Sequence, residues 1–252
     1  MTIRLNCDIG ESFGPWTMGD DQLLMPYVDM ANIACGFHAS DPLVMQRTVA
    51  LAVEHEVKIG AHPGYPDLQG FGRRSMNCSA DEIYAMVQYQ VGALQAIAKA
   101  QGARVEYVKP HGAMYNDMTA DERLFDAVLR AIADLGEGMR LVVLATEDNQ
   151  QNREQARQHG VSLWFEGFAD RAYDDNGRLR SRNRADAVYQ YNQKILDQVE
   201  AFAKKRPISS INGEPLDITI DTLCVHGDNP KSVETVKAIR SLIDEINNES
   251  SE

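Results

Sequence analysis

Short apolar runs that end on a histidine or an aspartate recur along the chain, and they constrain its fold more than any other feature. A run of this length bounded by glycine or proline is typical of a buried strand. A polar group therefore stands repeatedly at the C-terminal end of a predicted strand. In parallel α/β folds, substrates bind and catalytic side chains gather at this end. The stretches are residues 5–8, 33–38, 59–62, 108–111 and 223–228.

Strand and helix signals alternate along the whole chain. Capping boxes are predicted at Ser79 and at Thr119, each before a helical apolar pattern. We also expect a helix over residues 185–205 and a hairpin with an Asn-Gly turn at residues 211–214. The predicted strands are residues 3–9, 28–34, 57–61, 104–108, 140–145, 162–165 and 218–225.

This alternation predicts a single-domain α/β fold, a distorted (β/α) barrel with about seven parallel strands. An open, doubly wound sheet is the competing architecture. However, the glycine-rich motifs of nucleotide-binding folds, G-x-G-x-x-G and G-x-x-x-x-G-K-[ST], follow none of the predicted strands. Because no Pro-, Gly- or Ser-rich linker divides the chain, we expect one catalytic domain over residues 1–252, with residues 247–252 as a disordered tail.

Charge and cysteine content limit the possible partners and the compartment. The formal net charge is −12, which argues against nucleic acid and anionic membranes, since both attract a basic surface. No apolar stretch approaches the roughly 20 residues of a membrane span, and the N-terminus has no signal-peptide core. The four cysteines lack CxxC spacing. We therefore expect a cytoplasmic protein with reduced thiols.

Candidate metal ligands stand after the first three predicted strands. Asp8 lies at the end of the first strand and Glu11 just after it, as a general base or as metal ligands. His38 and His62 follow the second and the third strand. One carboxylate with two imidazoles is a common ligand set for zinc, manganese or iron, which makes Asp8, His38 and His62 the candidate ligands. The alternative for Asp8, His38 and His62 is a structural role near a helix cap, and for Glu11 it is a solvated surface position.

The fourth and seventh predicted strands also end on reactive groups. Lys109 can hold a carboxylate or phosphoryl oxygen, and His111 can act as an acid or a base because its ordinary pKa lies near neutrality. His226 and Asp228 follow the seventh strand, although Asp228 is also well placed to cap the last helix.

Arginines gather in two segments of loop-like composition. Arg73 and Arg74 follow Gly72, where they either bind an anionic substrate group or form a solvated face. Residues 170–184 contain five further arginines. We interpret this segment as a flap over the site or as a surface for a partner protein.

Together these stretches resemble the LamB/YcsF family. The matching segments occur in order along nearly the whole chain, which makes their joint occurrence specific. They are residues 5–11, 32–41, 60–67, 70–74, 108–116, 166–173 and 224–228.

The resemblance implies a barrel of the glycoside hydrolase/deacetylase type and a cytoplasmic hydrolase that cleaves a cyclic amide C–N bond. The implied reaction is that of the bacterial ATP-dependent 5-oxoprolinase, which opens the lactam of 5-oxo-L-proline to L-glutamate. ATP, with Mg²⁺, would be the co-substrate. The resemblance also implies a complex with two further subunits, B and C.

Within this reaction, ATP can activate the lactam oxygen as a phosphorylated imidate, which water then attacks. Lys109, Arg73 and Arg74 are candidates for holding the phosphoryl group. We assign Glu11, Arg73, Arg74 and Asp228 to substrate binding, and whether a metal is bound stays open. The residues that we assign to catalysis are Asp8, His38, His62, Lys109, His111 and His226.

Two other interpretations of the sequence remain. One is a stand-alone, metal-dependent amide hydrolase such as a deacetylase. The other is a non-catalytic scaffold protein that only docks the other components of the complex.

Overall fold

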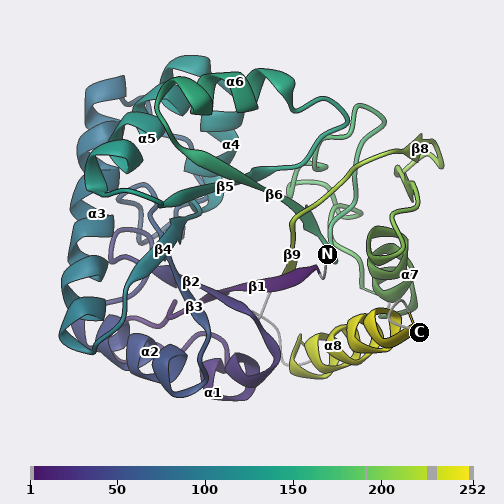
Figure 1. Cartoon of the computed structure of the whole chain (residues 1–252), viewed down its shortest axis with the longest axis horizontal. Helices are drawn as coiled ribbons and strands as arrows, with labels where there is room; N and C mark the ends of the chain where they lie inside the picture. The colour runs from purple at the N-terminus through teal and green to yellow at the C-terminus, as the bar shows by residue number, and fades with distance from the viewer. Residues whose placement is uncertain (1–2, 191, 226–231, 250–252) are drawn as a thin grey trace.

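In the computed structural model, seven parallel strands close into a barrel that is surrounded by helices (Figure 1). The structure describes residues 3–190, 192–225 and 232–249. The strand order follows the chain, and the barrel closes where β1 pairs with β9. The predicted barrel is thereby confirmed. Its strands are β1 (Arg4–Ile9), β2 (Met30–Ala34), β3 (Lys58–His62), β4 (Val105–Val108), β5 (Arg140–Leu144), β6 (Ser162–Phe168) and β9 (Thr222–Val225).

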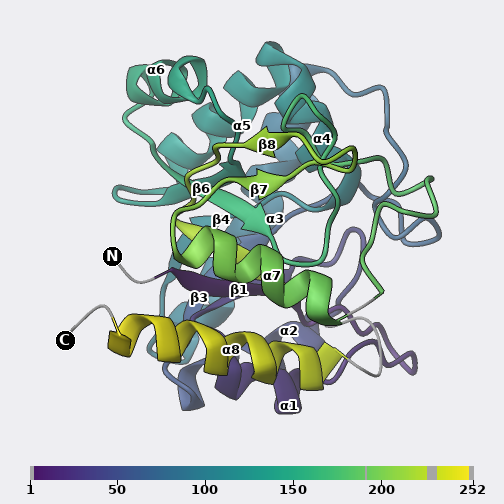
Figure 2. The ribbon, with the colours of Figure 1, turned by 90° about the vertical axis from the view of Figure 1, so that its right-hand side faces the viewer.

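Helices and one small hairpin complete the fold. Helices α7 and α8 pack side by side beside the barrel (Figure 2). The antiparallel pair β7 (Ile208–Ser209) and β8 (Pro215–Leu216) confirms the predicted hairpin. Among the described residues, no helix is long and apolar enough to cross a membrane. The helices are α1 (Asp21–Leu24), η1 (Met25–Tyr27), α2 (Pro42–Glu54), α3 (Ala80–Ala100), α4 (Gly112–Ala120), α5 (Glu122–Leu135), α6 (Gln150–Gln158), α7 (Asn192–Ala203) and α8 (Ser232–Glu249).

Alternation along the strands separates an apolar outer face from a polar inner face. On β1, Leu5, Cys7 and Ile9 join the main apolar core, whereas the amide of Asn6 bonds Thr222 of β9 at 2.9 Å. Successive side chains of a strand point to opposite faces, so a carboxylate or an amide inside the barrel alternates with core residues outside it. The part of the barrel interior that contains Asn6 and Thr222 is therefore polar.

A separate apolar cluster of Met30, Tyr107 and Val142, with Trp164 packed against it, fills another part of the barrel. Gly60 of β3 makes room for the Tyr107 ring, because a Cβ atom at position 60 would overlap that ring. The Tyr107 hydroxyl donates to Asn32 Oδ1 at 2.7 Å. The apolar cluster thus lies directly against the polar side chains inside the barrel.

Local signals explain where several of the described helices begin. The capping box at Ser79 is present, with the Ser79 and Glu82 side chains each bonded to the other's backbone N–H. Asp41 caps α2 by accepting from the N–H groups of Leu43 and Val44.

Three expectations about helices were wrong. Helix α4 was not predicted, and Thr119 lies inside it with its hydroxyl bonded to Tyr115 O, so Asp121 and not Thr119 caps α5. The helix expected from residue 185 begins at Asn192, because the Ala187 carbonyl and the Tyr189 N–H pair with the backbone of Ala172 and Asp170. Helix α8 extends to Glu249, so the first three residues of the expected disordered tail are helical.

Candidate active site

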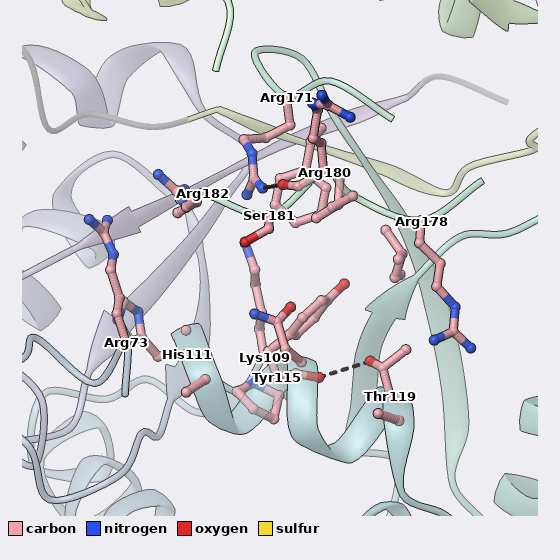
Figure 3. A pocket seen from close by; sticks show the side chains of 18 of the residues that line it. Arg73, Lys109, His111, Tyr115, Thr119, Arg171, Arg178, Arg180, Ser181 and Arg182 are labelled. Carbon is pink, nitrogen blue, oxygen red and sulfur yellow. Dashed lines mark hydrogen bonds between the residues drawn. The ribbon is translucent and has the colours of Figure 1, made fainter. Parts of the chain in front are cut away.

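A cavity of about 740 Å³ opens at the C-terminal ends of the barrel strands. Asp8 of β1, His62 of β3 and Lys109, which directly follows β4, line its base. Residues between β6 and α7 line its other side, and Figure 3 shows Arg171 among them on the side opposite Lys109 and Tyr115. The predicted gathering of polar side chains at the strand ends is therefore present in the structure.

Lys109 is buried between two carboxylates. Its Nζ lies 3.1 Å from Asp8 Oδ1 and 3.0 Å from Glu166 Oε2. It also contacts Asn6 Oδ1 and Cys224 Sγ, each at 3.1 Å. Burial on its own would lower the pKa of Lys109, but the negative charges around it, Asp8 foremost, hold that pKa well above its usual range. Lys109 is thus a permanent ammonium whose donors are occupied by the protein.

Backbone carbonyls fix the orientation of two histidines. His62 Nδ1 lies 2.6 Å from Lys109 O, and His111 Nε2 lies 2.8 Å from Phe71 O. A carbonyl only accepts, so each of these nitrogens carries the hydrogen, and in the neutral rings His62 Nε2 and His111 Nδ1 present lone pairs. These two atoms face each other at 2.9 Å. Such a pair of lone pairs requires a proton or a cation between them.

His38 and Glu11 complete this cluster. The His38 ring stacks on His111 with centroids 3.7 Å apart, and His38 Nε2 lies 3.3 Å from Glu11 Oε1. Glu11 Oε1 is 3.6 Å from His111 Nδ1. One ligand atom from each of Glu11, His38, His62 and His111 lies within 4.8 Å of the others. We call these four residues the His/Glu cluster.

Burial keeps the His38 and His111 imidazoles of the His/Glu cluster neutral, with nitrogen lone pairs for a ligand. Burial lowers the pKa of both His38 and His111 well below the usual range, so neither imidazole readily accepts a second proton. Three imidazole nitrogens and one carboxylate are ligands that zinc, manganese and iron accept. The residues present therefore fit a transition-metal ion.

A glycine allows the loop after β3 to approach the cluster closely. Gly72 has φ +62°, and a Cβ atom there would press against the His38 side chain at its Cβ and against the His111 ring. Its carbonyl accepts from the Ala113 N–H at the start of α4. The Gly70-Phe71-Gly72 segment thus holds the Phe71 carbonyl in place for His111.

The structure unites most of the predicted site residues and separates one of them. Asp8, His62, Lys109 and His111 line the cavity with Glu11 and Arg73, and His38 packs behind them on His111. Arg74 instead pairs with Asp67 beside a separate surface hollow, so it lies outside the cavity. His226 and Asp228 lie outside the described residues.

The structure differs from the expected set of metal ligands at Asp8. His38 and His62 belong to the His/Glu cluster, but their partners there are Glu11 and His111. Asp8 approaches His62 Nε2 only to 3.4 Å, and its Oδ1 is held by Lys109 and by the Asn32 amide at 2.8 Å. Asp8 is therefore placed next to the cluster, with Oδ2 toward it.

Sequence reasoning missed Glu166, Asn6 and Asn32. All three are fully buried, and they surround Lys109 and Asp8. Glu166 carried the same signal as Asp8, a carboxylate at the end of an apolar run. It escaped notice because the sixth strand was expected to end at residue 165, whereas β6 extends to Phe168.

Comparison with known proteins identifies the family. The sequence profile described as "LamB/YcsF family" matches residues 3–251. The chain belongs to the LamB/YcsF family.

Individual relatives are similar over almost their full length. A protein from Chromohalobacter salexigens, named as the A subunit of 5-oxoprolinase, is 55% identical over 95% of this chain and 96% of its own. A protein from Pseudomonas aeruginosa, also named as a 5-oxoprolinase A subunit, is 54% identical over 97% of each chain. The crystal structure of the lactam utilization protein from Thermus thermophilus superposes with a TM-score of 0.90, at 36% identity over 98% of both chains.

Proposed function

We propose that this LamB/YcsF protein is one component of an ATP-dependent 5-oxoprolinase that opens the lactam of 5-oxo-L-proline to L-glutamate. The observation that carries the proposal is the name 5-oxoprolinase on relatives that match nearly the whole chain. The cavity supports it, because it offers a carboxylate and imidazoles beside buried cations. We propose that the whole barrel acts as one catalytic domain. Its four free cysteines suit the reducing cytoplasm, where we place the reaction.

Asp8 is the proposed base. Its Oδ1 is held by Lys109 and Asn32, while Oδ2 faces His62 at the cavity. Asp8 would take a proton from the attacking water as the water oxygen bonds to the lactam carbonyl carbon. With the lactam oxygen phosphorylated by ATP, it would return that proton to the ring nitrogen as the C–N bond breaks, which leaves the amine and an acyl phosphate. A second water would then release inorganic phosphate and form the new carboxyl of glutamate.

Lys109 orients and balances this base. Its ammonium offsets the charge of Asp8 and fixes the carboxylate in place, and its two remaining donors are shared among Glu166, Asn6 and Cys224. The role of phosphoryl ligand that the sequence favoured for Lys109 therefore passes, in this proposal, to arginines elsewhere in the cavity. ATP would activate the lactam oxygen by phosphorylation, together with subunits B and C.

We infer that the His/Glu cluster holds a divalent cation. A cation bound there would polarise the lactam carbonyl or lower the pKa of the attacking water. His62 and His111 donate their other N–H groups to Lys109 O and Phe71 O, as ligating histidines usually do.

A second candidate function is a stand-alone, metal-dependent amide hydrolase. The His/Glu cluster favours it, because such enzymes need little beyond a cation and a base. The two candidates differ in their need for ATP and for partner subunits.

Reconstitution separates them. The purified chain is assayed for glutamate and ADP release from 5-oxoproline with Mg²⁺-ATP, alone and together with subunits B and C. We expect both products only from the complete set. Hydrolysis by the chain alone, independent of ATP and abolished by a chelator, would support the stand-alone hydrolase instead.

A further inference from the structure

An ordered arm between β6 and α7 covers the cavity. Arm residues 169–190 pair with one another through bridges between Arg171 and Val188 and between Tyr173 and Leu179. The Ala172 N–H donates to Ala187 O, and the Arg180 N–H donates to Ala172 O. The arm is therefore a built structure that fixes the position of its arginines.

Arg171 is the buried cation of this arm. Only 6% of its surface is exposed, and it lines the cavity. Its Nε donates to Ala187 O at 3.2 Å, and its Nη2 donates to Arg180 O at 2.6 Å. A guanidinium has five N–H donors in a rigid fork, so Arg171 is held by the arm and still has donors to spare.

Arg171 and its neighbour Arg180 are balanced differently, because the charge of Asp170 acts on Arg171 without an ion pair between the two. In the described part of the chain, no carboxylate lies within ion-pair distance of Arg171. Its neighbour Arg180, by contrast, pairs with both Asp174 and Asp186 at 2.7 Å. Burial, and next the like charge of Arg182, lower the pKa of Arg171 to about 10. The spare donors of the buried Arg171 guanidinium therefore suit an anionic ligand in the cavity.

The charge of the cavity is opposite to that of the whole protein. The chain carries 37 acidic and 25 basic residues. Among the described residues, the cavity wall instead has more basic than acidic side chains, with Arg73, Arg178 and Arg182 lining it from different sides besides Arg171 (Figure 3). A wall of this kind concentrates anions.

We propose that Arg171 and Arg182 form a subsite in this chain for the phosphoryl group of a ligand, opposite Asp8 and Lys109. Forked guanidinium donors match the oxygens of a phosphoryl group, and two guanidiniums suit a dianion better than a single carboxylate. The cavity is also larger than a small lactam alone requires. The phosphoryl group belongs to a nucleotide, to a phosphorylated substrate or to released phosphate. Only the link between this subsite and lactam opening rests on the proposed function.

The test is direct binding to the isolated, folded chain. Inorganic phosphate, ATP and 5-oxoproline are titrated separately by calorimetry into the wild type and into Arg171→Gln, Arg182→Gln and Arg184→Gln. Arg184 belongs to the same arm but does not line the cavity, so its variant is the matched control. Arg182 is exposed, unlike Arg171, so its variant reports on binding even if Arg171→Gln loosens the arm.

We expect phosphate or ATP to bind the wild type and Arg184→Gln alike, and to bind Arg171→Gln and Arg182→Gln at least about tenfold more weakly. Tighter binding of ATP than of phosphate would identify a nucleotide as the source, and equal binding would identify a lone phosphoryl group. Equal binding by all variants, or none by the wild type, would overturn the subsite. Loss of 5-oxoproline binding alone would reassign Arg171 to the substrate carboxylate and also overturn it.

The subsite and the proposed function fail separately. Glutamate production by the reconstituted complex without phosphate or ATP binding to this chain would refute the subsite alone. Arginine-dependent phosphate binding without turnover of 5-oxoproline would leave the subsite and refute the function.

Discussion

At the scale of single residues, buried charges that compensate one another define this site. Lys109 is 3% exposed and Glu166 is fully buried, yet both sit in the barrel interior beside Asp8. Buried ions of this kind persist only when each is paired and hydrogen-bonded. These three residues thus stabilise one another. Removing one of them should lower the free energy of unfolding, because the others remain as uncompensated buried charges.

Lys109→Met should destabilise the protein strongly because it leaves Glu166 and Asp8 as uncompensated buried carboxylates. We expect a loss of roughly 3–5 kcal/mol in the free energy of unfolding, measured with urea. Adding Glu166→Gln should restore part of that loss. As a control, Lys58→Met breaks the partly exposed pair with Glu106 and should cost at most about 1 kcal/mol. A double variant no more stable than Lys109→Met would show that the pairing does not govern stability.

Asp21 gives the protein a predictable pH dependence. Burial raises the pKa of this carboxyl to about 6, although the Gly10 N–H donates to it at 3.1 Å. Because the folded chain holds this proton more tightly than the unfolded chain, the associated stability is full below about pH 4 and is lost as the pH rises to about 6.

Asp21→Asn should remove this dependence. Its advantage in unfolding free energy over the wild type should grow between about pH 4 and 6 and then level off, at about 1–3 kcal/mol. Urea unfolding of both proteins across this range measures the difference. A difference that does not change with pH would contradict the assigned cause.

The residues of the site were partly predictable. Asp8, His62, Lys109 and His111 were found because each ends an apolar run, a local signal. Arg171 was seen only as one of five arginines in a polar segment, because its burial depends on backbone bonds to Ala187 and Arg180. The pairing of Glu11 with His38 and His111 likewise depends on loops from different units of the barrel.

At the scale of elements, strand alternation decides which side chains meet inside the barrel. On β3, Ile59 and Ala61 belong to the main core, while Gly60 gives its space to Tyr107 of β4 and His62 enters the cavity. The period of two along β3 thus puts Gly60 and His62 on the same face of the strand. The Tyr107 ring of β4 fills the space beside Gly60, and His62 reaches the cavity.

Gly60→Ala should therefore be destabilising for steric reasons. The new methyl group overlaps the Tyr107 ring, and we expect a loss of about 1–3 kcal/mol in unfolding free energy. Gly92→Ala is the matched control, because Gly92 lies inside α3 with open space around it. That variant should gain roughly 0.5–1 kcal/mol. Equal effects of the two substitutions would mean that the Tyr107 ring moves aside without a loss of unfolding free energy.

The elements themselves were easier to predict than their boundaries. Apolar runs located all seven barrel strands, since the run is itself what the barrel buries. Helix α4 was missed because His111 at its N-cap provides no side-chain capping bond and burial of the consecutive residues 113–115 gives this short helix no amphipathic pattern. The start of α7 was misplaced because tertiary pairing of the Ala187 and Tyr189 backbone overrides a local helical pattern.

At the scale of the whole molecule, barrel closure makes one site from residues far apart in the sequence. Asp8 lies on the first barrel strand and Glu166 on the sixth, so they are far apart in the sequence. Both nevertheless contact Lys109, since barrel closure pairs β1 and β6 each with β9. Parallel strands bring all their C-terminal ends to one edge. The arm between β6 and α7 then covers that edge with arginines.

The most direct test of this account is glutamate production from 5-oxoproline by the complex of this chain with subunits B and C, comparing Asp8→Asn with Glu245→Gln. Glu245 lies on the exposed face of α8, so its variant controls for the loss of one negative charge. We predict that Asp8→Asn forms the complex but loses at least about 100-fold in turnover, as expected for removal of a base, while Glu245→Gln keeps full activity. Undiminished turnover by an assembled Asp8→Asn complex would contradict the assignment of lactam hydrolysis to this site.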